Sequence, residues 1–178
     1  MESPRVGGGF SSGKRVVVAA PHGLFRGGAM MRVRDLLSAE RVKPALESVD
    51  KLATLREMAF LLAAGGEVEF AVALEALLER ERLGSTGVGR GVAIPHGKVE
   101  GLTAPLAALG RSTAGIPFDA LDGQPVHLVM ALLSPMEPPE LHLQALAAIS
   151  RLLREEAAAA QLLRAPDAQA LFQRAAGG

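Results

Sequence analysis

The residues best suited to chemistry lie in one glycine-rich stretch, which runs from Gly84 to Lys98 and reads GSTGVGRGVAIPHGK. Its histidine, His96, follows a short apolar run and is flanked by Pro95 and Gly97. Proline fixes its own backbone torsion and donates no hydrogen bond, and glycine lets other groups approach the main chain closely. This setting indicates a histidine held toward a reactant. The chain has no Cys, Tyr or Trp, so it offers few other nucleophiles.

His96 has three interpretations. It could be a satisfied core histidine. It could bind a metal, but the other histidines of the regular part, His127 and His142, lack the short helical spacing of a zinc-binding pair, so we expect no metal site. It could attack phosphorus, because a neutral imidazole is nucleophilic near neutral pH and forms a phosphoramidate that is a good donor. Lys98 and the amides of the loop Gly84-Ser85-Thr86-Gly87 would then offset the charge of the transferring group.

The glycine-rich loop fits neither common nucleotide-binding motif. A P-loop needs a second glycine followed by Lys and a hydroxyl residue, whereas Arg90-Gly91 follow Gly89. The dinucleotide fingerprint fails at its third glycine, where the chain has Val92. Backbone N–H groups of such a loop can still bind an anion. We therefore expect an anion-binding loop rather than a nucleotide site.

Three further histidines differ in their setting. His142 begins a predicted helix directly after a double proline. There it would help to bind an incoming phosphoryl group if it faced His96, and a surface histidine is the alternative. His127 opens an apolar strand and is interpreted as structural, and His22 as a solvated bystander.

The composition excludes several classes of function. Basic and acidic residues balance at 19 each, so no overall field attracts nucleic acid or an anionic membrane. Aromatic residues make up only 3% of the chain, too few for a base-stacking surface. The lack of cysteine excludes disulfides and thiolate metal sites and fits a cytoplasmic protein. No apolar run approaches the ~18 residues of a membrane-spanning helix. We expect neither a nucleic-acid partner nor direct membrane insertion.

Residues 1–30 differ from the rest of the chain. They are rich in glycine and basic residues, and their apolar run Val16–Ala20 is shorter than the roughly 7–15 residues of a secretory signal. We interpret this segment as a disordered leader. Because Met30 and Met31 offer an alternative start, the leader need not belong to the native protein. Residues 31–178 are expected to form the functional domain.

From Met31 onward the apolar pattern predicts helices, then strands, then helices. An edge strand is expected at 42–46, because Pro44 cannot occupy a central position. The other expected strands are 92–94, 104–109 and 126–133, the last nearly all apolar and therefore central. The expected helices are 52–63 with Ser48 or Asp50 as N-cap, 68–82, 141–153, 155–164 and 167–174. This order favours the α/β (or α+β) class, with a small mixed β-sheet flanked by helices on both sides in a single domain.

The region around His96 resembles the phosphorylation site of enzyme IIA proteins of the bacterial phosphotransferase system, in the fructose, mannitol and nitrogen-type group. In that group an Arg-Glu pair leads into Gly-Ser-Thr-Gly and then into a run like Gly-x-Ala-Ile-Pro-His-Gly-Lys. The resemblance covers roughly residues 31 to the C-terminus. The residues of this chain that carry it are Arg80-Glu81, Gly84-Ser85-Thr86-Gly87, Val92-Ala93-Ile94-Pro95-His96-Gly97-Lys98, the run from Phe118 to Val126, and His142-Leu143.

The resemblance implies a phosphoryl carrier built on a mixed sheet surrounded by helices. His96 corresponds to the histidine that accepts the phosphoryl group, and His142 to a second histidine beside it. Arg80 corresponds to an arginine that aids phosphate or partner contacts. His127 stands where nitrogen-type proteins often have an acidic residue, which leaves its role open. The donor would be a small phosphohistidine carrier of the HPr type, and no magnesium, nucleotide or other cofactor is needed.

Two outputs fit the same phosphohistidine. A sugar-specific IIA passes the group to a IIB component and then to a sugar, whereas a nitrogen-type IIA is a signal read by regulatory target proteins. The chain has no cysteine for a fused IIB active site, and the ending His96-Gly97-Lys98 resembles the nitrogen-type version. We therefore favour the regulatory branch. A binding module that uses the same fold without phosphoryl transfer is the third hypothesis.

Overall fold

The computed structural model describes residues 30–177. The expected disordered leader therefore lies, apart from Met30, outside the described residues. In chain order the elements are a 3-10 helix (Val33–Asp35), strand β1 (Leu37–Lys43), helices α1 (Lys51–Ala63) and α2 (Phe70–Arg82), strands β2 (Gly87–Gly89), β3 (Val92–Ala93), β4 (His96–Val99), β5 (Leu106–Ile116) and β6 (Val126–Pro135), and helices α3 (Pro139–Arg154), α4 (Glu156–Leu163) and α5 (Ala168–Ala176).

The strands form one six-stranded mixed sheet in the order β1-β5-β6-β3-β2, and β4 also pairs with β6. β5 runs antiparallel to β6 on one side. On the other side β3 and then β4 pair in parallel with successive parts of β6. β6 is therefore central, and this explains its nearly continuous apolar sequence, because such a strand is buried on both faces.

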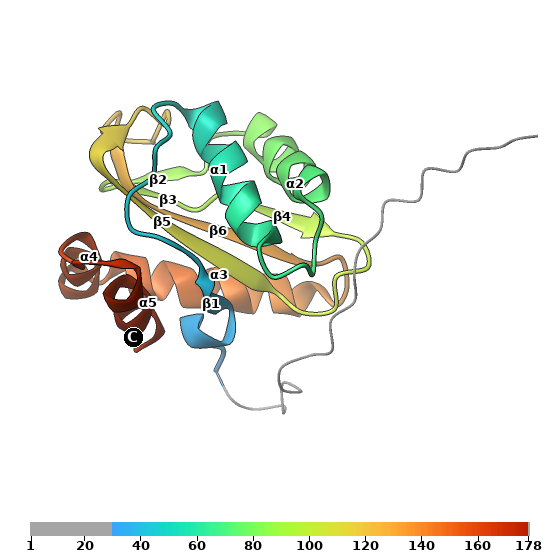
Figure 1. The fold of residues 1–178 in the computed structure, drawn as a ribbon. Coiled ribbons are helices and arrows are strands. Elements are labelled where there is room, and N and C mark those ends of the chain that lie inside the picture. The colour runs from blue at the N-terminus through green and yellow to red at the C-terminus, as the bar shows by residue number, and fades with distance from the viewer. Residues whose placement is uncertain (1–29, 178) are drawn as a thin grey trace, which may run out of the picture.

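Helices cover both faces of the sheet, with α1 and α2 on one face and α3, α4 and α5 on the other (Figure 1). The side chains of β6 alternate between the two layers. Leu128 and Met130 pack in the apolar cluster that contains α3 and α5, whereas Val129 and Ala131 pack in the cluster that contains α1 and α2. The predicted fold class, a mixed sheet flanked by helices on both sides, is thus confirmed.

The predicted starts of α1 and α5 are close to the observed ones because their capping signals act locally. Asp50 accepts a hydrogen bond from the amide of Ala53 at the start of α1, and Asp167 accepts one from Ala170 at the start of α5. Each carboxylate satisfies an amide that the first helical turn leaves unpaired. No helix within residues 30–177 is both long enough and apolar enough to cross a membrane.

The edge strand predicted at 42–46 is wrong in position. The observed strand β1 ends at Lys43, directly before Pro44, although it does lie at the edge of the sheet. Its burial departs from simple alternation because Arg41 is only 4% exposed and pairs with Glu67. A prediction based on the pattern of apolar residues does not recognise a buried arginine as a residue that faces the core.

The remaining strand errors concern polar and glycine-rich segments. β5 extends to Ile116, well beyond the predicted end at residue 109, and its polar part is used structurally. There Arg111 donates hydrogen bonds to the carbonyls of Pro44, Leu163 and Ala165, so it ties β5 to the C-terminal helices. β2 and β4 were not predicted, because both contain glycine, which has low strand propensity.

Candidate functional site

His96 is the first residue of β4 and is fixed by main-chain pairing with the central strand. The amide of Leu132 donates to the carbonyl of Pro95 at 2.9 Å, directly before the histidine. On the other side of the histidine, Gly97 packs against α2 so closely that a Cβ atom there would lie 2.8 Å from the carbonyl oxygen of Ala76. The flanking proline and glycine noted in the sequence thus hold His96 between β6 and α2.

The hydrogen bonds of the His96 ring define its tautomer. Nδ1 lies 2.8 Å from the carbonyl oxygen of Ile94, which can only accept, so Nδ1 carries the proton. Nε2 accepts from Nε–H of Arg80 at 3.0 Å, so Nε2 carries the lone pair. Burial lowers the pKa of His96 and the Arg80 charge lowers it further, against the opposing effects of Ile94 and Glu81. The ring is therefore neutral and nucleophilic at Nε2 near neutral pH.

Arg80 lies in the last turn of α2 and links the histidine to the glycine-rich loop. Besides its bond to His96, it donates from Nη1 to the carbonyl oxygen of Gly84 at 3.1 Å. Two hydrogen bonds in different directions fix the plane of the guanidinium group. Its positive charge is thereby held beside the nitrogen that carries the lone pair.

The loop Gly84-Ser85-Thr86-Gly87, predicted to bind the phosphoryl group, uses most of its amides internally. The amide of Gly84 donates to the carbonyl of Glu81, that of Thr86 to the Glu81 carboxylate, and that of Gly87 to the hydroxyl of Ser85. The Ser85 hydroxyl in turn donates to the carbonyl of Phe118 at 2.9 Å. Three of the four amides thus have partners within the chain. The contact that the loop does make to the site is the carbonyl of Gly84, which positions Arg80.

Glu81 organises this loop, and it was not singled out as a site residue from the sequence. Its side chain is 8% exposed and accepts from the amide and the hydroxyl of Thr86, the latter at 2.5 Å. Lys51 of α1 pairs with Glu81 at 3.0 Å and with Asp119 at 2.7 Å. The signal available in the sequence was the adjacent pair Arg80-Glu81. Adjacent residues on a helix point in different directions, so the two side chains can contact different groups, His96 for Arg80 and Thr86 for Glu81.

His142 lies in the first turn of α3, and its ring faces that of His96 with 5.5 Å between the centroids. Burial, followed by the charges of His96, Lys98 and Arg80, lowers the pKa of His142 to about 4. Its ring is therefore neutral near pH 7. Its Nδ1 lies 2.5 Å from the hydroxyl oxygen of Ser134. The structure brings together the two histidines that were predicted to share one site.

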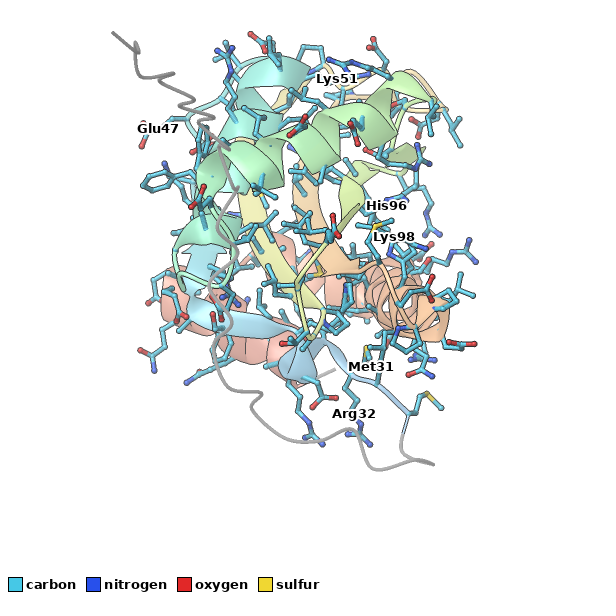
Figure 2. The ribbon with its side chains drawn as sticks, turned by 90° about the vertical axis from the view of Figure 1, so that its right-hand side faces the viewer. Met31, Arg32, Glu47, Lys51, His96 and Lys98 are labelled. Carbon is cyan, nitrogen blue, oxygen red and sulfur yellow. The ribbon has the colours of Figure 1, made fainter. Side chains whose placement is uncertain are left out.

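Lys98 is exposed and lies two residues after His96 on β4, so both side chains leave the same face of the strand. Figure 2 shows the two side chains near each other, on the side of the molecule away from Glu47. The effect of Lys98 on the pKa of His142 places its charge within reach of the same site. The site thus holds two neutral imidazoles and two cations, a combination suited to an anionic group.

His127 has a different environment. Its Nδ1 lies 3.0 Å from the carbonyl oxygen of Ser112, and its amide donates to the carbonyl of Gly91 at 2.8 Å. Its ring lies so close to Gly115 that a Cβ atom there would approach it to 2.9 Å. These contacts support the structural interpretation of this histidine. Among residues 30–177 no group of three or more His, Cys, Asp or Glu is placed to hold a metal ion.

Comparison with known proteins identifies the family. The family described as "Phosphoenolpyruvate-dependent sugar phosphotransferase system, EIIA 2" matches residues 35–175. The chain is 45% identical over 143 residues to the "Nitrogen regulatory protein" of Bradyrhizobium diazoefficiens, a match that covers 80% of this chain and 93% of that protein. It is 38% identical over 143 residues to the "PTS system fructose-specific EIIABC component" of Bacillus subtilis, covering 80% of this chain and 22% of that protein.

The fold agrees with a solved structure of the same kind. The crystal structure of the nitrogen regulatory protein IIA-Ntr from Neisseria meningitidis superposes with a TM-score of 0.74 at 30% identity, covering 80% of this chain and 97% of that one. The chain therefore belongs to the EIIA type 2 family of the phosphotransferase system. Both nitrogen regulatory and fructose-specific proteins occur among its relatives.

Proposed function

We propose that this protein is a phosphohistidine carrier that accepts a phosphoryl group on Nε2 of His96 from an HPr-type protein and acts as a regulatory, nitrogen-type IIA. One observation carries the proposal: the Nδ1 proton of His96 is bound to the Ile94 carbonyl, so the lone pair lies on Nε2 beside Arg80 and opposite His142. A histidine that served only in core packing would not need a second imidazole beside its ring and a cation at its basic nitrogen.

The transfer step follows from this tautomer. The Nε2 lone pair attacks phosphorus of the donor phosphohistidine, the new N–P bond forms, and the donor's P–N bond breaks with its electron pair returning to the donor ring. No proton has to leave His96, because Nδ1 keeps its own. The ring gains positive charge as the bond forms, and the carbonyl dipole of Ile94 at Nδ1 stabilises that charge.

The surrounding residues act on the phosphoryl oxygens. Arg80 must give up its hydrogen bond to the Nε2 lone pair during attack, and its N–H groups then turn to the phosphoryl oxygens. His142 and Lys98 stabilise the same group from the other side. The loop at 84–87 contributes through Arg80, which it holds by the Gly84 carbonyl.

Exposed apolar side chains beside the site suit a protein donor. Leu83 follows α2 and is 84% exposed, and Leu121 is 83% exposed next to the loop, where its amide bonds to Gly87. Met136 and Leu143, on either side of the start of α3, are 50% and 65% exposed. Apolar side chains around a polar centre are typical of protein interfaces. We propose that the HPr-type donor docks over them.

The regulatory branch is favoured by the relatives. The nitrogen regulatory proteins of Bradyrhizobium diazoefficiens and Neisseria meningitidis, two of several relatives with that name, align with this chain over 93% and 97% of their own length. The alternative is a sugar-specific IIA that passes the group to a IIB component, which the fructose-specific relative favours. Regulatory target proteins, rather than a IIB component, are then the expected readers of the phosphorylation state.

The functional domain is proposed to comprise residues 31–178, in the cytoplasm, with residues 1–30 as a leader outside it. Met31 supports this boundary, because its side chain is 3% exposed and packs in the apolar cluster beneath the sheet, whereas Met30 is 69% exposed. The family match from residue 35 to residue 175 agrees with it.

Phosphorylation in vitro tests the proposal. Incubation with phosphoenolpyruvate, enzyme I and an HPr-type protein should give an acid-labile, base-stable label on this protein. His96→Ala should abolish the label, and His127→Ala, which changes a histidine held by Ser112, should retain it. The absence of label with every matched donor would favour the binding module. Rapid transfer of the label to a IIB protein would favour the sugar-specific alternative.

A further inference from the structure

Ser134 is a buried hydroxyl residue in the site that the proposed transfer step does not use. It lies near the end of β6, paired with Lys98 of β4, and is 0% exposed. Its Oγ lies 2.5 Å from Nδ1 of His142 and 3.5 Å from the carbonyl oxygen of Gly97. A buried hydroxyl with two possible acceptors raises the question of which one receives its single proton.

The two distances favour one direction for the hydrogen bond. O–H donors lie about 2.7–2.8 Å from their acceptors, and a separation of 3.5 Å is at the limit of such a bond. A bond to the Gly97 carbonyl across 3.5 Å would be weak, so the geometry favours donation from the Ser134 hydroxyl to Nδ1 of His142. Nδ1 then carries the lone pair, and the single proton of the neutral ring lies on Nε2.

The tautomer matters because His142 is neutral. With a pKa of about 4, its ring has only one N–H near pH 7. A proton on Nε2 gives a donor for a phosphoryl oxygen on His96, whose ring centroid is 5.5 Å away. A lone pair on Nε2 would instead repel that oxygen. One hydroxyl thus determines whether the second histidine attracts or repels the transferred group.

We infer that Ser134 is a positioning residue that holds His142 in the Nε2–H tautomer, oriented to donate to the phosphoryl group on His96. The inference rests on the proposed role of His96. Ser134 acts through His142 and does not itself contact the phosphoryl group. Replacing this fully buried side chain with alanine removes the hydroxyl that lies against Nδ1.

Nitrogen-15 NMR of the wild-type imidazoles tests the tautomer directly. We expect an unprotonated Nδ1 and a protonated Nε2 for His142, and the reverse for His96. In Ser134→Ala the His142 signals should shift toward the average of the two tautomers, and Ser134→Thr, which retains the hydroxyl, should restore the wild-type pattern. Ser112→Ala changes another buried serine and should leave the His142 signals unchanged. A wild-type His142 with its proton on Nδ1 would overturn the inference.

Transfer kinetics give the second readout. The loss of one hydrogen bond to the charged phosphoryl group predicts that Ser134→Ala slows transfer from the HPr-type donor by about tenfold. In a His142→Ala background the same change should have no further effect, because Ser134 acts through that ring. Additive losses would overturn the inference. Failure of the wild-type protein to accept label would refute the role of His96 instead, while the NMR result on the tautomer would stand separately.

Discussion

Replacing Arg80 with methionine is the substitution whose consequences the site geometry defines most fully. The change removes a charged N–H that lies 3.0 Å from Nε2 of His96, together with the bond to the Gly84 carbonyl. Methionine keeps much of the length of the side chain and suits a helix. We therefore expect Arg80→Met to fold normally and to be slower in phosphoryl transfer, at the step in which the negatively charged phosphoryl group approaches His96.

The size of the effect follows from the kind of bond that is lost. A hydrogen bond to a charged group contributes about 1.5–3 kcal/mol, and 1.36 kcal/mol corresponds to a tenfold rate change, so transfer should slow by about 10- to 150-fold. Arg80→Lys should be intermediate, because it keeps the charge but loses the planar pair of donors. The pKa of His96 should rise in Arg80→Met, since Arg80 lowers it in the wild type.

The assay is single-turnover transfer from phosphorylated HPr-type protein, measured from pH 5 upward, with an NMR titration of His96. Arg82→Met is the control, because Arg82 lies in the same last turn of α2 and is exposed. Protonation of His96 removes the nucleophilic lone pair, so the transfer rate falls as the pH is lowered. Because the pKa of His96 is higher in Arg80→Met, the rate of this variant should begin to fall at a higher pH than the rate of the wild type. Equal transfer rates for Arg80→Met and Arg82→Met, with both proteins folded, would refute the role assigned to Arg80.

Three further predictions concern neighbouring residues. The unfolded chain protonates His142 near pH 6.5 and the folded chain near pH 4, so stability measured by chemical denaturation should fall as the pH is lowered through this range. The full shift corresponds to about 3.4 kcal/mol, which solvent screening at this partly exposed ring reduces to about 2 kcal/mol. His142→Ala should reduce that slope, leaving the part that comes from the lowered pKa of His96, and should also slow transfer. Gly97→Ala should lose about 1–3 kcal/mol of unfolding free energy by forcing β4 away from α2, unlike the exposed Glu100→Ala; equal midpoints would contradict the packing argument. Glu81→Gln should slow transfer and increase amide exchange at Thr86, and unchanged exchange would refute its hold on the loop.

The sequence predicts those parts of the fold in which local signals and packing agree. The apolar run of β6 indicates a central strand because nothing else can bury it, and Asp50 and Asp167 mark helix starts through hydrogen bonds to nearby amides. β1 was misplaced because its inward position is held by Arg41 and a distant Glu67, a pairing that no local pattern reveals.

The candidate site was predicted in its residues more fully than in its contacts. The spacing around His96 and the position of His142 identify both rings, but only the folded sheet shows that they face each other. The sequence of the loop at 84–87 is typical of an anion-binding loop, but the amide of Thr86 already donates a hydrogen bond to the Glu81 carboxylate. The role of Ser134 could not be predicted from the sequence. The residue lies within an apolar strand, and its contact is with His142 of α3, a helix that begins after the strand has ended.

The most direct test of the account is to locate the phosphoryl group on the protein atom by atom. After phosphorylation by an HPr-type donor, phosphorus–nitrogen coupling in nitrogen-15-labelled protein should assign the group to Nε2 of His96, with the Nδ1 proton still bound to the Ile94 carbonyl. A phosphoryl group on Nδ1 of His96, or on any other residue, would contradict the central claim.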